Sequence, residues 1–275
     1  MTKHSKQFFF TRVVLIAISL VFAMPFLWML ATSLKPDHQL FDNYTAFFPV
    51  ELAWDNYSQA ISYFPFWTYL GNSILITAGS VLGTVLVSPL VAYSFSKIKW
   101  PGRGLCFALM LSTILLPSAA TLVPTFLVFK NLHLIDTYWP LILPAFSGVA
   151  AHIFLIRQFL STIPNVLIEA ARIDGAGEWQ IYRLIILPLT KPVLLIIALF
   201  QFVAAWNNYL GPLLYLNRDQ LYPLSLGLPL FMSKYGTHWN WMMAAATLSI
   251  IPTFIFFLFA QRYLIEGIKM SGIKG

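Results

Sequence analysis

Charge is scarce in this chain of 275 residues. Asp, Glu, Lys and Arg together make up only 10% of the residues, whereas 59% are hydrophobic. A soluble globular domain is about half apolar and about a quarter charged. One aqueous core cannot hide so much apolar surface, and the composition therefore predicts a protein whose solvent is lipid.

Cysteine is nearly absent as well. Cys106 is the single one, which excludes an intrachain disulfide and a zinc site built from several thiolates. The sequence also lacks Gly-x-x-x-x-Gly-Lys-Ser/Thr, the loop that cradles the phosphates of ATP. Any energy from ATP must therefore enter through another chain.

Charged residues are missing from the middle of every long apolar interval. His152 and His238 lie near the ends of such intervals, where helix capping or contact with the headgroup region explains them. An ion-coupled carrier places ionisable groups inside the membrane, and an enzyme needs catalytic groups paired at one depth. Neither pattern is present, which disfavours both classes and favours a neutral, hydroxyl-rich solute for any pore here.

Six intervals are long enough for one transmembrane helix each, given about 20 residues per span. We expect an all-α membrane protein, one domain over residues 1–275, with six spans at about 13–34, 70–96, 104–129, 137–156, 192–217 and 241–261. The first interval is longer than the apolar part of a signal peptide, so we interpret it as an uncleaved helix. In the third span, Pro117, Ser118 and Pro124 predict a broken helix, either a gate hinge or a packing kink. In the second, Gly79 and Gly83 predict close helix packing.

The basic residues give the orientation. With both termini in the cytoplasm, only four of the 17 Lys and Arg lie outside: Lys35, Lys130, Arg218 and Lys234. The positive-inside rule strongly favours this arrangement. The polar loop 161–190 then lies in the cytoplasm.

This loop contains Glu169-Ala170-Ala171, then Gly175, then an Ile-x-Leu-Pro run. We expect a helix over residues 165–174, a left-handed stop at Gly175, and a second helix over residues 178–187 that Pro188 ends. Glu169 could pair with Arg172, Arg183 or a cation of another protein. The residues expected to seat the second helix against the protein's own underside are Ile181, Leu184, Ile185 and Leu187. An ordinary interfacial helix would explain the mixed polarity but not this spacing.

The spacing resembles the EAA loop of ABC-importer permease subunits. The basic segment 97–103, Trp206-Asn207-Asn208 and the tail 271–275 are also similar to the carbohydrate-type permeases, especially the second permease subunits of maltose-like importers. The resemblance covers nearly the whole chain. It implies the type I ABC importer permease fold and a multi-pass place in a bacterial-type inner membrane. It further implies a second permease, two ABC ATPase subunits and an extracellular or periplasmic solute-binding protein, with no nucleic acid.

The resemblance also implies functional residues. The cytoplasmic coupling helix would contact the ATPase, which uses ATP and Mg, while this chain binds no cofactor or metal. The expected coupling residues are Glu169, Ala170, Ala171, Asp174, Gly175, Ile185, Leu187 and Pro188. The expected substrate is a sugar or sugar derivative, and the alternatives are a phosphorylated polyol, another small solute, or an ion-coupled carrier.

A polar cluster in the fifth span is the candidate for the substrate path. Its residues are Trp206, Asn207, Asn208 and Tyr209. Asparagines at membrane depth are costly unless they face water, protein or solute. Hydrogen bonding to a partner permease explains them equally well. The outer segment 218–241 is either a contact for the binding protein or a loop at the membrane interface.

Overall fold

The computed structural model describes residues 3–42, 47–233 and 236–271. The tail singled out above, residues 271–275, lies outside these ranges except for Ser271. The chain forms two compact units, residues 1–67 with 227–251 and residues 68–226 with 252–275. The single domain over residues 1–275 stays a prediction.

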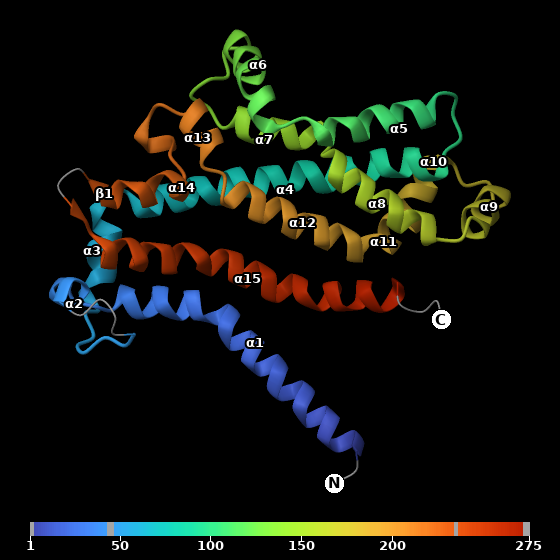
Figure 1. Ribbon diagram of the computed structural model, residues 1–275. Helices are drawn as coiled ribbons and strands as arrows, with labels where there is room; N and C mark the ends of the chain where they lie inside the picture. The colour runs from blue at the N-terminus through green and yellow to red at the C-terminus, as the bar shows by residue number, and fades with distance from the viewer. Residues whose placement is uncertain (1–2, 43–46, 234–235, 272–275) are drawn as a thin grey trace. The chain divides into compact units, whose positions relative to one another are not determined.

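The regular structure of the described residues is almost entirely helical, as predicted (Figure 1). Four helical segments, one of which joins α7 and α8, are long and apolar enough to cross a membrane, and there are up to six spans if each of two bent pairs counts as one. The four are Phe9–Ser33, Phe66–Lys97, Trp139–Thr162 and Trp239–Gln261. The bent pairs are Arg103–Leu115 with Ser118–Asn131, at 103°, and Glu178–Leu189 with Lys191–Trp206, at 74°.

The first unit holds α1 (Lys3–Ser33), α2 (Asp37–Asp42), α3 (Asp55–Tyr63), η4 (Leu228–Phe231) and the start of α15 (Trp239–Ser271). Two short strands, β1 (Met232–Ser233) and β2 (Gly236–Thr237), pair antiparallel, with Met232 opposite Thr237. The buried Asn56 amide joins the helices. Its Nδ2 donates to the carbonyls of Ser33 and Lys35 at 2.9 Å, and its Oδ1 accepts from Asn240 at 3.1 Å. Such pairing is what a buried amide requires.

The second unit contains the remaining helices. Before the polar loop 161–190 these are α4 (Phe66–Lys97), α5 (Arg103–Ser112), η1 (Thr113–Leu115), α6 (Ser118–Asn131), α7 (Trp139–Phe146) and α8 (Ala150–Thr162). The loop itself forms α9 (Val166–Ile173), α10 (Glu178–Ile181), the π-helical η2 (Tyr182–Ile186) and α11 (Leu187–Leu189). After it come α12 (Lys191–Trp206), α13 (Leu210–Tyr215), η3 (Asp219–Leu221) and α14 (Leu224–Gly227).

The core of this unit lies where α4, α8 and α12 meet the helices of the loop. Its fully buried members include Ile156, Ile181 and Ile197. Farther along, α4 packs closely on α7. A Cβ on Gly83 would lie 2.5 Å from the Phe146 ring, and one on Gly79 would lie 3.0 Å from Ile142. The two glycines therefore permit the close packing that the sequence predicted.

Breaks interrupt three of the expected spans. The third breaks at residues 116–117, where Pro117 precedes α6 and lacks the N–H that would continue the helix of η1. The fourth breaks between α7 and α8, where Gly148 adopts φ +86°. In the fifth, α12 ends at Trp206 and Asn207 is its C-cap. Only the first of these breaks was predicted, because a proline is a recognisable helix breaker in a sequence and an Asn C-cap is not.

Candidate functional site

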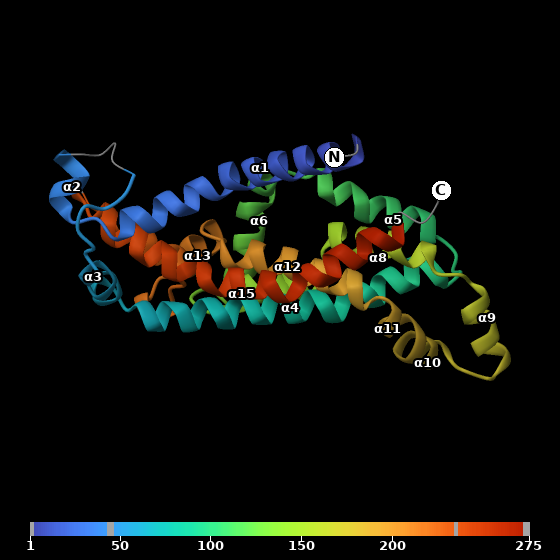
Figure 2. The ribbon, with the colours of Figure 1, turned by 90° about the horizontal axis from the view of Figure 1, so that it is seen from below.

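Helix α9 projects beyond the end of α4, whereas α10 and α11 lie beside the last turns of α4 (Figure 2). We call residues 163–190 the elbow. The first elbow helix, α9, has two distinct faces. Ile168 is buried in the core and Ala171 packs against it, three residues on. On the other face, Val166 is 70% and Ile173 86% exposed. Such exposed apolar side chains form a surface suited to a partner.

Glu169 lies on the exposed face of α9. The expected pairing with Arg172 or Arg183 is absent, since the Glu169 carboxylate makes no hydrogen bond or ion pair with any described residue. Ala170 is exposed beside it. The Glu-Ala-Ala sequence therefore presents a carboxylate and a small side chain outward, while Ala171 turns towards the core.

Gly175 ends α9 in the left-handed conformation that the sequence predicted, with φ +81°. Asp174 is the C-cap residue. The Gly175 N–H donates to the carbonyl of Arg172 at 3.1 Å, and the Ala176 N–H donates to that of Ala171 at 2.9 Å. These two bonds form a Schellman motif. A Cβ on Gly175 would have no atom within 4 Å, so glycine is needed there for its backbone alone.

Pro188 does not end the second elbow helix, and that prediction was wrong. The helix continues through α11 to Leu189, and the Thr190 N–H donates to the carbonyl of Ile186 at 3.0 Å. The reason is the π turn over residues 182–186. A proline in a regular α-helix clashes with the carbonyl four residues earlier. The wider i→i+5 turn displaces that carbonyl and admits the proline.

The π turn also changes which side chains face the core. Ile181, Tyr182 and Ile186 are buried, at 0%, 5% and 1% exposure. Leu184, expected in the seat, is 69% exposed, because the extra residue in the turn shifts the inward face. Half-buried positions are Ile185 and Leu187. Burying one large aliphatic side chain stabilises the folded protein by about 1.5–3 kcal/mol. The buried side chains therefore hold the second elbow helix firmly against the core.

One carboxylate joins the elbow to α4. Glu178 Oε2 accepts from the Tyr93 hydroxyl at 2.6 Å, and Oε1 accepts from Arg172 Nε at 3.0 Å and from an Arg172 terminal nitrogen at 2.6 Å. The Tyr93 hydrogen bond and the Arg172 guanidinium hold the pKa of the Glu178 carboxyl below its usual range. We call these three residues the Glu178 clasp.

The two halves of the clasp differ in strength. The Arg172 and Glu178 side chains are 44% and 45% exposed, and an exposed ion pair contributes about 0–1 kcal/mol. Tyr93 is only 4% exposed, and a hydrogen bond to a charged group contributes about 1.5–3 kcal/mol. The connection to α4 is therefore the stronger half.

The other end of the elbow also contacts α4. Lys97, in the last turn of α4, donates from Nζ to the carbonyl of Ile163 at 2.7 Å and to Asn165 Oδ1 at 2.8 Å. Ile163 is the C-cap of α8, whose free carbonyls favour a cation. The last two turns of α4 thus hold the elbow before and after α9.

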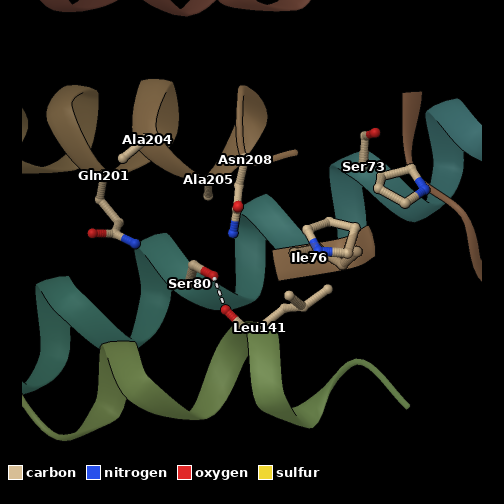
Figure 3. A pocket seen from close by; sticks show the side chains of 10 residues that line it. Ser73, Ile76, Ser80, Leu141, Gln201, Ala204, Ala205 and Asn208 are labelled. Carbon is tan, nitrogen blue, oxygen red and sulfur yellow. Dashed lines mark hydrogen bonds between the residues drawn. The ribbon is translucent and has the colours of Figure 1, made fainter. Parts of the chain in front are cut away.

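A second candidate site is a polar pocket of about 180 Å³ within the second unit (Figure 3). Its lining comes from Ser73, Ile76, Ser80, Leu141, Gln201, Ala204, Ala205, Asn208, Pro212 and Pro223. None of these residues is charged. Ser80 donates to the Leu141 carbonyl at 3.2 Å, and Ser73 Oγ accepts from the Leu224 N–H at 2.8 Å.

Two amides in this pocket keep free hydrogen-bonding capacity. Asn208 Oδ1 accepts from the Gly211 N–H at 3.0 Å, but its Nδ2 has no described partner. The Gln201 side chain likewise bonds to no described residue. Figure 3 shows both amides directed towards α4. They can donate to and accept from the hydroxyls of a solute. Among the described residues, no three His, Cys, Asp or Glu side chains are grouped to hold a metal ion.

Of the four residues expected on the substrate path, only Asn208 lines this pocket. Trp206 is buried and stacks on Phe202 with 5.5 Å between ring centroids. Asn207 donates to the Val203 carbonyl at 2.9 Å, and Tyr209 is 41% exposed.

Sequence reasoning missed three polar residues of the pocket, Ser73, Ser80 and Gln201. A signal for them was present. Ser73 and Ser80 are seven residues apart, which places them on one face of α4. Gln201 and Asn208 have the same spacing in the sequence, although α12 ends at Trp206, before Asn208.

Residues 4–270 match the family described as "Binding-protein-dependent transport system inner membrane component". The chain is 33% identical over 261 residues, 94% of its length and 93% of the relative's, to the arabinooligosaccharides transport system permease protein AraQ of Halalkalibacterium halodurans. It is 28% identical over 288 residues, 98% and 96% of the two lengths, to the maltose/maltodextrin transport system permease protein MalG of Escherichia coli K12.

A solved structure shares the fold. It is a chain from the crystal structure of a bacterial ABC transporter involved in the import of the acidic polysaccharide alginate. The TM-score is 0.80 at 25% identity, covering 96% of this chain and 98% of the other.

Proposed function

The chain belongs to the family of binding-protein-dependent transport system inner membrane components, and we propose that it is one permease subunit of an ATP-driven importer of sugars or sugar derivatives. The permease class follows from the match over residues 4–270. The names of the relatives that import arabinooligosaccharides and maltodextrins support a carbohydrate solute.

The elbow is proposed as the dock for the ATPase. The observation that carries this proposal is the outward face of α9, with Glu169 unpaired among the described residues and Ile173 86% exposed. The distribution of Lys and Arg supports a cytoplasmic elbow and cytoplasmic termini. Because no ATP-binding loop occurs in the sequence, ATP and Mg belong to the partner ATPase.

The residues proposed to serve coupling divide by their place in the elbow. Glu169, Ala170, Asp174 and Gly175 are exposed and close to the docking face. Ala171, Ile185 and Leu187 are half-buried, and Pro188 follows the π turn, so these four transmit force to the rest of the protein. A rigid seat matters because a docked helix moves the spans only when it is firmly attached to them.

The polar pocket is proposed as this subunit's part of the solute path. Its lining has hydroxyls and two free amides but no charged side chain, which favours a neutral, hydroxyl-rich solute over a phosphorylated polyol. A phosphate would call for Arg or Lys at the site. A second permease subunit would complete the pathway, and an extracellular solute-binding protein would deliver the solute.

The proposal is tested by uptake into proteoliposomes. The chain is reconstituted with its second permease, its ATPase and its binding protein, and uptake of labelled arabinooligosaccharides and maltodextrins is measured with internal ATP. We expect uptake that requires both ATP and the binding protein and that persists after an ionophore collapses ion gradients. An ATPase unable to hydrolyse ATP is the control. Uptake that survives without ATP but stops with the ionophore would instead indicate an ion-coupled carrier.

A further inference from the structure

The docking helix α9 has few attachments of its own. Of its residues, Ile168 is the one that is buried. Next to the turn that follows it, the small side chains of Ala171 and Ala176 pack against the core. Held by one large buried side chain and these two alanines, the helix would swing about the turn at Gly175. Transmission of its movement therefore needs a further connection.

The Glu178 clasp supplies this connection. Arg172 belongs to α9, Glu178 to α10 and Tyr93 to α4, so a single carboxylate bonds to groups on both sides of the turn. The hydrogen bonds from Arg172 to Glu178 hold the angle between α9 and α10. The Tyr93 bond, at 2.6 Å and with a buried donor, fixes that angle relative to α4.

Helix α4 carries this contact to the polar pocket. Tyr93 and Ser80 lie on the same unbroken helix, thirteen residues apart, which corresponds to about 20 Å at ~1.5 Å per residue. Ser73 lines the pocket two turns further on. Lys97 adds a second attachment between α4 and the start of the elbow. One helix therefore touches the elbow at one end and the pocket at the other.

We propose that Glu178 and Tyr93 are positioning residues that transmit movement of the docking helix α9 to α4 and so to the polar pocket. This inference rests on the proposed role of the elbow as the ATPase dock. It assigns α4 as a receiver of that movement, in addition to α12, which continues directly from the elbow. Neither residue lines the polar pocket, and each acts through the helices that it joins.

The test removes one hydroxyl. Tyr93→Phe keeps the ring in the core and deletes only the bond to Glu178. Tyr182→Phe is the matched control, because Tyr182 is equally buried, lies 5.6 Å from Tyr93 between ring centroids, and its hydroxyl has no described partner. The complex is reconstituted, and solute transported per ATP hydrolysed is measured for each variant.

We expect Tyr93→Phe to lower this ratio about tenfold or more, the equilibrium factor that corresponds to one hydrogen bond to a charged group, while complex assembly and ATP hydrolysis continue. Glu178→Ala should lower it similarly. The double variant should be no worse than the poorer single variant, because both changes break the same connection. Tyr182→Phe should keep the original ratio. An unchanged ratio in Tyr93→Phe would overturn the proposal.

A second measurement does not depend on transport. Spin labels are placed at Leu167→Cys on α9, away from the docking face, and at Lys99→Cys beyond α4, both exposed, after the single Cys106 is replaced by Ser. In the assembled complex, Tyr93→Phe should broaden the distribution of distances between the labels, and Tyr182→Phe should not. If the complex shows no ATP-driven uptake but Tyr93→Phe still broadens the distances, the proposed function fails and the clasp stands. If uptake is normal and the distances stay unchanged in Tyr93→Phe, the clasp is wrong and the function stands.

Discussion

Replacing Gly175 tests whether the elbow turn depends on backbone conformation alone. Gly175 has φ +81°, and an added Cβ would meet no atom within 4 Å. Gly175→Ala therefore introduces no clash, and its cost comes only from the left-handed backbone, about 1–2 kcal/mol for an L-residue. A stiffer unfolded chain offsets about 0.4–1 kcal/mol of this. The net cost to the turn is on the order of 1 kcal/mol.

Two further variants grade the effect. Gly175→Asn should cost less than alanine, because asparagine tolerates the left-handed region. Gly175→Pro should cost most, since proline fixes φ near −65° and removes the N–H that donates to the Arg172 carbonyl. The predicted order of function is glycine, asparagine, alanine, proline.

The assay is binding-protein-stimulated ATP hydrolysis and solute uptake in proteoliposomes, with membrane insertion measured alongside. A loss of about 1 kcal/mol shifts the correctly turned population about fivefold, so alanine should reduce coupled uptake by up to that factor. Insertion should stay normal, because the turn lies outside the spans. If Gly175→Asn and Gly175→Ala impair coupled uptake equally, the reasoning is refuted. The effect would then come from a side-chain contact and not from the backbone conformation. Full transport by the proline variant would refute the reasoning as well.

Three other changes test packing, solute contact and charge. Gly83→Ala should lower the free energy of unfolding by about 1–3 kcal/mol, because the new Cβ would lie 2.5 Å from the Phe146 ring. Gly71→Ala is the control, since a Cβ there meets no neighbour and should not lower the free energy of unfolding. Thermal unfolding in detergent distinguishes the two variants. Gln201→Leu should raise the KM for uptake about two- to tenfold, because one hydrogen bond to the solute is lost. Basal ATP hydrolysis should stay the same. An unchanged KM would show that Gln201 does not line the solute path. The pKa of the Glu178 carboxyl is lowered in the folded protein, so its charged form stabilises the fold. This contribution to the free energy of unfolding is complete above pH 4.5, the ordinary pKa, and disappears as the pH falls through the lower pKa of the folded state. Unfolding scans from about pH 7 to about pH 3 should show this loss in the original chain and not in Glu178→Gln.

The elbow shows where sequence reasoning succeeds and where it stops. The left-handed stop at Gly175 was predicted correctly, because glycine after a helix-forming run has a local meaning. The end of the second helix at Pro188 was predicted wrongly, because the π turn that precedes it has no local signature in the residues 182–186. The same turn exposed Leu184 and buried Ile186. A single extra residue in one turn therefore changed both the length of the helix and its inward face.

The polar pocket shows a different limit. Asn208 was a candidate from its cost at membrane depth, but Asn207 beside it bonds to its own helix. The helix ends at Trp206, with Asn207 as its C-cap and Asn208 already beyond it, so the two side chains have different partners. Gln201 was not a candidate, and Ser80 was expected only to permit close helix packing, although each has a polar residue seven positions away. Which of these faces meet depends on the packing of α4 against α7 and α12.

The sequence by itself determined that the chain is a helical membrane protein. It also predicts, by the positive-inside rule, that the loop 161–190 faces the cytoplasm, and, from the missing phosphate loop, that another chain uses ATP. These conclusions depend on composition, on charge counts and on local motifs, which are properties of short segments. Only the tertiary structure decided that the Glu178 carboxylate joins Arg172 to Tyr93, 85 positions earlier in the chain than Glu178. It also decided that α4 touches both the elbow and the polar pocket. Contacts between distant segments depend on how helices pack, and packing responds to single residues such as Gly83 and to a single π turn.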